Sequence, residues 1–90
     1  MQIRFLVLER DRIFLLGLPL HLSPTEDRLL RAIAESGKGD VDSLLASLDG
    51  AVTRGNIAVH ISSINKKAAV ISGRRLIIRR SGKYKINPFM

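Results

Sequence analysis

The segment from Ser23 to Gly37 contains both the start signal and the stop signal of a helix, and this constrains the fold more than any other feature. Pro24 follows Ser23 directly, and Glu26 stands three positions after Ser23. This is the capping-box pattern with proline at the first helical position, where its missing N–H removes no helical hydrogen bond. A glycine after the last apolar position is a typical helix end. The pattern predicts a helix at about 24–36.

Residues 1–22, ahead of that helix, show the pattern of short strands. The stretch IRFLVL, residues 3–8, is expected to form one strand, and IFLL and LPLHL two more, separated by Gly17. Pro19 favours an edge position for the third strand, because proline donates no hydrogen bond to a ladder. These strands are apolar on both faces. We therefore expect one face to pack on the helices and the other to meet a homodimer mate or a partner domain.

Two further helices are predicted after the first. The stretch DVDSLLASLDG has Asp40 or Asp42 as its N-cap, and Gly50 ends it. A longer helix, at about 55–71, follows from apolar residues that recur at alternating spacings of four and three and so form one stripe. The members of this stripe are Ile57, Ile61, Ile64, Ala68 and Ile71.

The stretch IIRRSGKYKI, residues 77–86, predicts a β-hairpin, because the turn dipeptide Ser81-Gly82 separates two strand-like runs. Arg79, Arg80, Lys83 and Lys85 crowd this hairpin, although like charges across a ladder repel each other. We therefore expect the hairpin tip to meet an acidic partner.

The predicted fold class is α+β, in a single domain over 1–90. It consists of an antiparallel β-meander over 1–22, a three-helix unit over 24–71 and a C-terminal hairpin over 75–87. Ninety residues are close to the size at which one hydrophobic core folds unaided. Two helices joined by a turn, followed by a basic hairpin, are the order of a winged helix-turn-helix.

The charge is distributed unevenly along the chain. Residues 1–50 carry six Lys or Arg and eight Asp or Glu, whereas residues 51–90 carry nine Lys or Arg and no carboxylate. A long folded segment with one sign of charge favours a polyanionic partner, and nucleic acid comes before an anionic membrane surface. The chain has no cysteine, no apolar run of the ~18 residues that span a membrane, and no signal-peptide pattern. We expect a cytoplasmic, nucleoid-associated protein.

The inventory of reactive residues argues against an enzyme. His21 and His60 are the only histidines, and neither has a neighbouring nucleophile or the spacing of metal ligands. The stretch SGKGD lacks the preceding strand and the spacing of a phosphate-binding loop. We expect no enzyme activity, no cofactor and no metal site.

Three motifs together resemble the winged-helix effector domain of two-component response regulators of the OmpR/PhoB type. Leu22, Ser23, Pro24 and Glu26 match the segment that leads into the first helix of that family. Ile57, Val59, His60 and Ile61 match its recognition helix, and Arg80, Gly82 and Tyr84 match part of its wing signature. The resemblance covers almost the whole chain. It implies that the 55–71 helix enters the major groove of duplex DNA and that the hairpin, as the wing, reaches the minor groove.

The chain also departs from this family at two places. An arginine-rich run of the recognition helix reads Ser62-Ser63-Ile64-Asn65-Lys66 here, so bidentate contact between arginine and guanine is missing. The loop AVTRG before the long helix is shorter than the loop with which the family contacts RNA polymerase, and Asp49 replaces its Trp. This argues against direct contact with the polymerase.

We therefore predict sequence-specific binding of duplex DNA by a transcriptional regulator or the effector domain of a response regulator. The alternatives are a winged-helix module for protein interaction or oligomerisation, and an RNA-binding domain, which the missing aromatic stacking platform disfavours. The expected phosphate contacts are Arg54, Lys66 and Lys67. The expected base contacts are Val59, for a thymine methyl, Ser62, Ser63 and Asn65, for adenine. The expected wing contacts are Arg79, Arg80 and Lys83.

Overall fold

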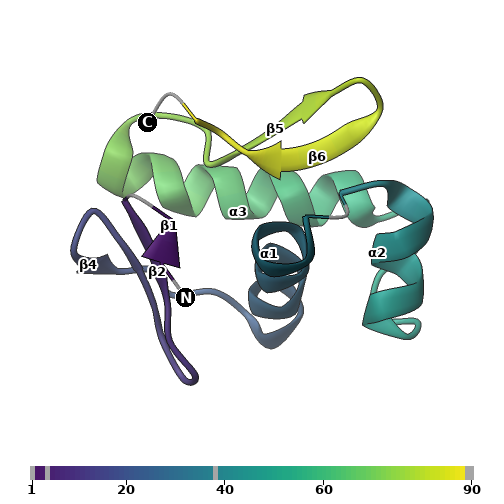
Figure 1. Ribbon diagram of the computed structural model, residues 1–90, viewed down its shortest axis with the longest axis horizontal. Helices are drawn as coiled ribbons and strands as arrows, with labels where there is room; N and C mark the ends of the chain where they lie inside the picture. The colour runs from purple at the N-terminus through teal and green to yellow at the C-terminus, as the bar shows by residue number, and fades with distance from the viewer. Residues whose placement is uncertain (1, 4, 38, 89–90) are drawn as a thin grey trace.

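The computed structural model describes residues 2–3, 5–37 and 39–88. In that part of the chain, the order of elements is four short strands, three helices and two more strands, which form a small α+β structure with two antiparallel sheets (Figure 1). The predicted α+β class is confirmed. The three helices separate the two sheets along the chain, and the second sheet is the C-terminal hairpin.

The N-terminal sheet is a meander of strands in sequence order. Its strands are β1 (Gln2–Ile3), β2 (Leu6–Leu8), β3 (Ile13–Leu15) and β4 (Leu18–Pro19). The prediction of one strand over 3–8 is wrong, because β1 folds back on β2 and Gln2 pairs with Val7. The apolar run contains no Gly, Pro, Asn or Asp that would signal this turn, and residue 4 lies outside the described residues. Pro19 lies on the edge strand, as predicted.

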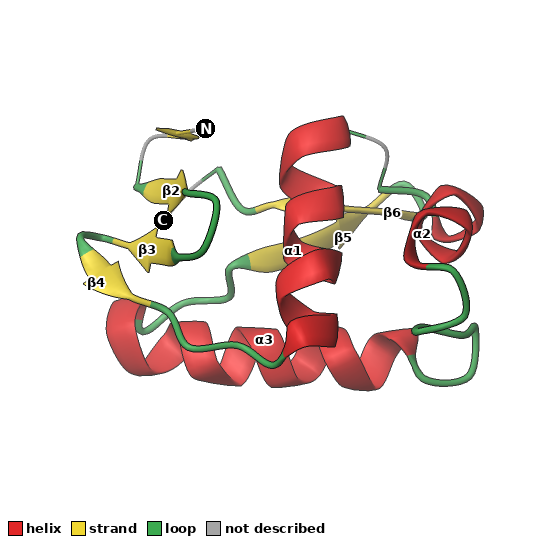
Figure 2. Ribbon diagram, turned by 90° about the horizontal axis from the view of Figure 1, so that it is seen from below, coloured by secondary structure: helices red, strands yellow, loops and turns green. Residues whose placement is uncertain are grey.

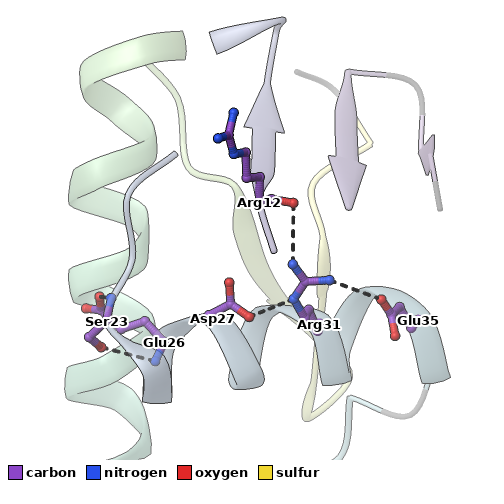
Figure 3. A network of polar contacts seen from close by, with 6 residues as sticks. All are labelled: Arg12, Ser23, Glu26, Asp27, Arg31 and Glu35. Carbon is purple, nitrogen blue, oxygen red and sulfur yellow. Dashed lines mark hydrogen bonds and ion pairs between the residues drawn. The ribbon is translucent and has the colours of Figure 1, made fainter. Parts of the chain in front are cut away.

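Helix α1 spans Pro24–Ser36, as its capping signals predict. The Ser23 N–H donates to Glu26 Oε1 at 2.8 Å, and the Glu26 N–H donates to Ser23 Oγ at 3.2 Å. Gly37, which follows the helix, has a φ of 67° and so ends it in the left-handed conformation. The start signal therefore forms its expected contacts (Figure 3), and the stop signal has its expected conformation.

One arginine connects α1 to the meander (Figure 3). The Arg31 Nε donates to Asp27 Oδ1 at 2.6 Å, and a second guanidinium nitrogen donates to the main-chain carbonyl of Arg12 at 3.4 Å. The third nitrogen lies 3.8 Å from Glu35. Arg31 thus joins one face of α1 to the turn between β2 and β3.

Helix α2 spans Val41–Leu48, and Asp40 is its N-cap, with its side chain accepting from the Ser43 N–H at 3.0 Å. Helix α3 spans Ile57–Ser72, two residues later at its start than predicted, because Asn56 and the residues before it form a turn. The predicted apolar stripe is buried from Ile57 to Ala68 and half-buried at Ile71.

A single hydrophobic core lies under these elements. The buried stripe of α3 packs against α1, which in turn packs against α2, and the meander and the hairpin contribute further side chains. The largest side chains that are fully buried are Leu6, Leu15, Leu29, Leu30, Leu44, Leu48, Ile64, Leu76 and Ile77. Both sheets and all three helices therefore share one core.

The C-terminal hairpin pairs β5 (Ile77–Arg80) with β6 (Lys83–Ile86) through the predicted two-residue turn. Ser81 and Gly82 both have positive φ, at 54° and 76°, which is the geometry of tight hairpin turns. The hairpin runs along α3, and its tip lies at the end where α3 begins and α2 stands (Figure 1). In Figure 2, α1 crosses both α3 and the hairpin.

The loop before α2 attaches to the hairpin near its tip. The Tyr84 N–H donates to the Gly39 carbonyl at 2.8 Å, and Asp40 forms a β-bridge with Lys83. A Cβ at position 39 would stand 1.6 Å from the Tyr84 carbonyl oxygen. Only glycine lets the two backbones approach this closely.

Candidate nucleic-acid interface

The face of α3 opposite its buried stripe is exposed and carries no carboxylate. Val59 is 67% exposed and Val70 is 88% exposed, and the side chains between them are small, polar or cationic. An α-helix repeats every 3.6 residues, so a stripe of apolar residues on one face leaves these positions pointing away from the core. The exposed members are Ala58, Val59, Ser62, Lys66, Lys67, Ala69 and Val70.

An open groove lies between this face of α3 and the hairpin, with a volume of about 450 Å³. None of its lining residues is acidic, and it contains one cation from α3 and one from the segment that joins α3 to β5. The residues that line it are Ala58, Ile61, Ser62, Asn65, Lys66, Ala69, Arg75 and Tyr84. The groove brings the predicted site residues Ser62 and Lys66 together with the hairpin.

Arg75 is a groove residue that the sequence reasoning missed. It precedes β5 and is exposed. In the sequence, Arg75 is marked as a candidate site residue only because it belongs to the acid-free C-terminal segment. Neither a helical periodicity nor a turn pattern marks its position. It belongs to the segment that joins α3 to β5, and this segment lies at the end of the hairpin opposite its tip (Figure 1).

Asn65 lines the groove, but its side chain is already bonded to the hairpin. Its Nδ2 donates to the Ile77 carbonyl at 3.0 Å, and the Ile77 N–H donates to its Oδ1 at 2.8 Å. Both ends of the amide are therefore occupied by the backbone of β5. Asn65 holds the hairpin against α3, and reading a base would break both of these hydrogen bonds.

Ser63 and Lys67 turn toward α1 and meet at Glu26. The Ser63 hydroxyl donates to Glu26 Oε2, and the Lys67 Nζ donates to Glu26 Oε1 at 2.5 Å. Glu26 is only 4% exposed. Burial on its own would raise the pKa of Glu26, but hydrogen bonds from Lys67, Ser63 and Ser23 lower it to about 2. Ser63 therefore takes part in the contact between α1 and α3. Lys67 takes part in the same contact, although its side chain stays partly exposed.

Two of the predicted cation sites lie beside carboxylates at the start of α2. Arg54 forms an ion pair with Asp42, in which both side chains are largely exposed. Lys83 lies at the hairpin tip, next to Asp40. Hydrogen bonds from Ser43 lower the pKa of Asp40, and the positive charge of Lys83 lowers it further. Carboxylates at the start of α2 thus compensate the charges of Arg54 and Lys83.

Arg79 stacks on the one tyrosine of the chain. Its guanidinium carbon lies 5.2 Å from the centre of the Tyr84 ring, which is within the range of a cation–π contact. Tyr84 is buried. Side chains alternate between the faces of a strand, so Arg79 and Tyr84 share the hairpin face that packs toward the core. Arg80 and Lys83, which pair at the tip, occupy the opposite face and are exposed.

Neither a protein-family model nor a curated protein matches this chain. The resemblance to response-regulator effector domains therefore depends on the three sequence motifs. Within the described ranges, no helix has the length and apolarity that crossing a membrane requires. The same residues contain no group of three or more His, Cys, Asp or Glu side chains that could hold a metal ion.

Proposed function

We propose that this chain is a winged helix-turn-helix module that binds duplex DNA, as part of a transcriptional regulator or of a response-regulator effector. Helix α3 lies in the major groove, with α2 as the preceding helix of the motif. The β5–β6 hairpin is the wing and lies against the neighbouring minor groove.

The observation that carries this proposal is the acid-free groove between α3 and the hairpin. The hairpin and the exposed face of α3 stand side by side (Figure 1), and Lys66, Arg75 and Arg79 lie on or beside the groove that they form. Positive charge gathered along one helix and the adjoining hairpin is the electrostatic footprint of a nucleic-acid-binding surface. The protein's acidic residues, by contrast, all lie within residues 1–50.

The positions of the side chains divide the proposed contacts into two sets. Lys66, Arg75 and Arg80 are exposed cations that no carboxylate compensates among the contacts of the described residues, and they bind phosphates. Val59 and Ser62 face the base edges. Arg80 is the cation best placed to enter a minor groove, since it stands at the tip of the hairpin on its outer face, and narrow A·T-rich grooves attract arginine.

A module for protein interaction is the second candidate, and one observation favours it. Leu16, in the turn between β3 and β4, is 52% exposed, and Leu18, at the start of β4, is 54% exposed. Leu16 also has a φ of 52°, a left-handed conformation that residues other than glycine rarely adopt. This apolar turn belongs to the N-terminal meander, which is the surface from which a homodimer or partner-domain contact is expected.

Titration of short duplex DNA with the purified chain at several salt concentrations separates the two candidates. If about four phosphates are neutralised, log K falls against log salt with a slope near −4. Lys66→Ala should weaken binding to all sequences alike and reduce the steepness of that slope by about one. The matched control is Arg10→Ala, which removes an exposed cation in the β2–β3 turn away from the groove and should leave the slope unchanged. A flat salt response, or no binding at low salt, would refute DNA binding and favour the interaction module.

A further inference from the structure

The polar side chains on α3 that could read a base edge are few. Both ends of Asn65 are bonded to β5, while Ser63 and Lys67 are bonded to Glu26. Ser62 and Lys66 remain on the exposed face. A lysine ammonium is a mobile point charge and a serine hydroxyl bonds either a donor or an acceptor, so neither selects one base strongly. Hydrogen bonds from α3 therefore give little discrimination between base pairs.

The exposed face of α3 instead offers methyl groups. Val59 is 67% exposed, and with Ala58, Ser62, Ser63 and Lys66 it lines a shallow depression of about 400 Å³ on the helix. The small side chains around it let the helix backbone approach a partner closely. A branched apolar side chain in such a position can make contact with an apolar group and little else.

In the major groove of DNA, thymine alone among the four bases presents a methyl group. Val59 lies near the start of α3, at the end where the hairpin tip stands (Figure 1). From Val59 to Lys66 the helix rises about 10 Å, which matches roughly three base-pair steps. We infer that α3 selects thymine-containing sites through contact between Val59 and the thymine methyl group; this inference rests on the proposed function.

Val70 supplies a matched control within the same helix. It is the same residue type, it is more exposed, and it lies on the same face about 16 Å further along the helix. That distance places it beyond the three base pairs that Val59 to Lys66 would cover. Val59→Ala and Val70→Ala therefore make the same chemical change at a position inside the proposed contact and at one outside it.

The test compares duplexes that differ only in the methyl group at the C5 position of pyrimidines. Binding is measured for an alternating A·T duplex and for the same duplex with deoxyuridine in place of thymidine, at one low salt concentration. A second pair compares an alternating G·C duplex with its 5-methylcytosine form. Removing one methyl group from water changes affinity about fourfold. The wild-type chain should bind the thymine duplex about three- to tenfold more tightly than the uracil duplex, and should gain affinity from 5-methylcytosine.

The variants separate contact with the methyl group from any effect of the methyl on the shape of the duplex. Val59→Ala should bring the thymine-to-uracil ratio close to one, whereas Val70→Ala should keep the wild-type ratio. A ratio of one for the wild type, with normal binding to both duplexes, would refute the inference and leave DNA binding intact. A preference for thymine that survives in Val59→Ala would also refute it. Absence of binding to every duplex would overturn the proposed function and the inference together.

Discussion

Glu26 permits the sharpest test of the packing between α1 and α3. Its carboxylate is 4% exposed and accepts hydrogen bonds from Ser23, Ser63 and Lys67, the last of them charged. A pKa lowered from 4.5 to about 2 corresponds to roughly 3 kcal/mol in favour of the ionised form in the folded state. The Lys67 side chain is 43% exposed, so it regains water when its partner is lost. We therefore expect Glu26→Gln to lower the free energy of unfolding at pH 7 by about 2–3 kcal/mol.

The dependence on pH follows from the sign of the shift. The pKa of Glu26 is lower in the folded than in the unfolded chain, so its contribution is fully present well above pH 4.5. It is lost as the pH falls from about 5 toward 2, where the folded chain also takes up the proton. The difference in stability between wild type and Glu26→Gln should therefore be largest at neutral pH and should nearly vanish near pH 2.

Urea unfolding of both proteins at several pH values measures this difference, with helical circular dichroism as the signal. Glu35→Gln is the matched control, because Glu35 is an exposed carboxylate on the same helix, and its ion pair with Arg31 is long, at 3.8 Å. Its loss should change the free energy of unfolding by less than about 0.5 kcal/mol at any pH. If the free energy of unfolding that Glu26→Gln loses were the same at pH 7 and at pH 3, the charge of Glu26 would not be the source of its contribution. That result would refute the electrostatic explanation.

Three further changes test the hairpin and the charges near its tip. Asn65→Ala leaves buried backbone groups of β5 without partners and should cost about 1–3 kcal/mol, with faster hydrogen exchange along β5 as the local signal. Gly39→Ala should lower the free energy of unfolding by about 2 kcal/mol or more, because its Cβ would overlap a β6 carbonyl oxygen. Gly37→Ala is a useful comparison, because any loss of stability there should come from the left-handed φ alone. Asp42→Asn frees Arg54 and should strengthen binding to duplex DNA about twofold at low salt, without altering thermal stability; weaker binding would contradict this assignment.

The sequence predicted the helices well because their signals are local. Ser23 and Glu26 lie within one turn of each other, and the stripe from Ile57 to Ala68 repeats within a single helix. The strand boundaries of the N-terminal meander were harder to predict. An apolar run without turn residues gives no reason to divide 3–8, and the division depends on pairing with the next strand. Strand boundaries set by neighbouring strands cannot be read from the strand itself.

The candidate site shows the same limit at the level of side chains. Helical geometry accounts for the exposure of Val59 and Lys66, two expected contacts that lie opposite the apolar stripe of α3. It could not show that Ser63 and Lys67 bond to a carboxylate 37 and 41 positions earlier in the chain. It also could not show that Asn65 is used by β5. Periodicity gives the direction of a side chain, whereas its partner depends on where a distant element packs.

The hairpin is attached to the rest of the chain at both of its ends, and this bears on how fast the protein can engage a partner. Asn65 holds its base against α3, and the hydrogen bond between Gly39 and Tyr84 holds it near the tip. A surface fixed in this way loses little conformational entropy on association, because few backbone torsions remain to be ordered. Encounter should then be a rigid-body event, limited by diffusion and orientation and accelerated by positive charge, with no slow rearrangement of the hairpin after contact.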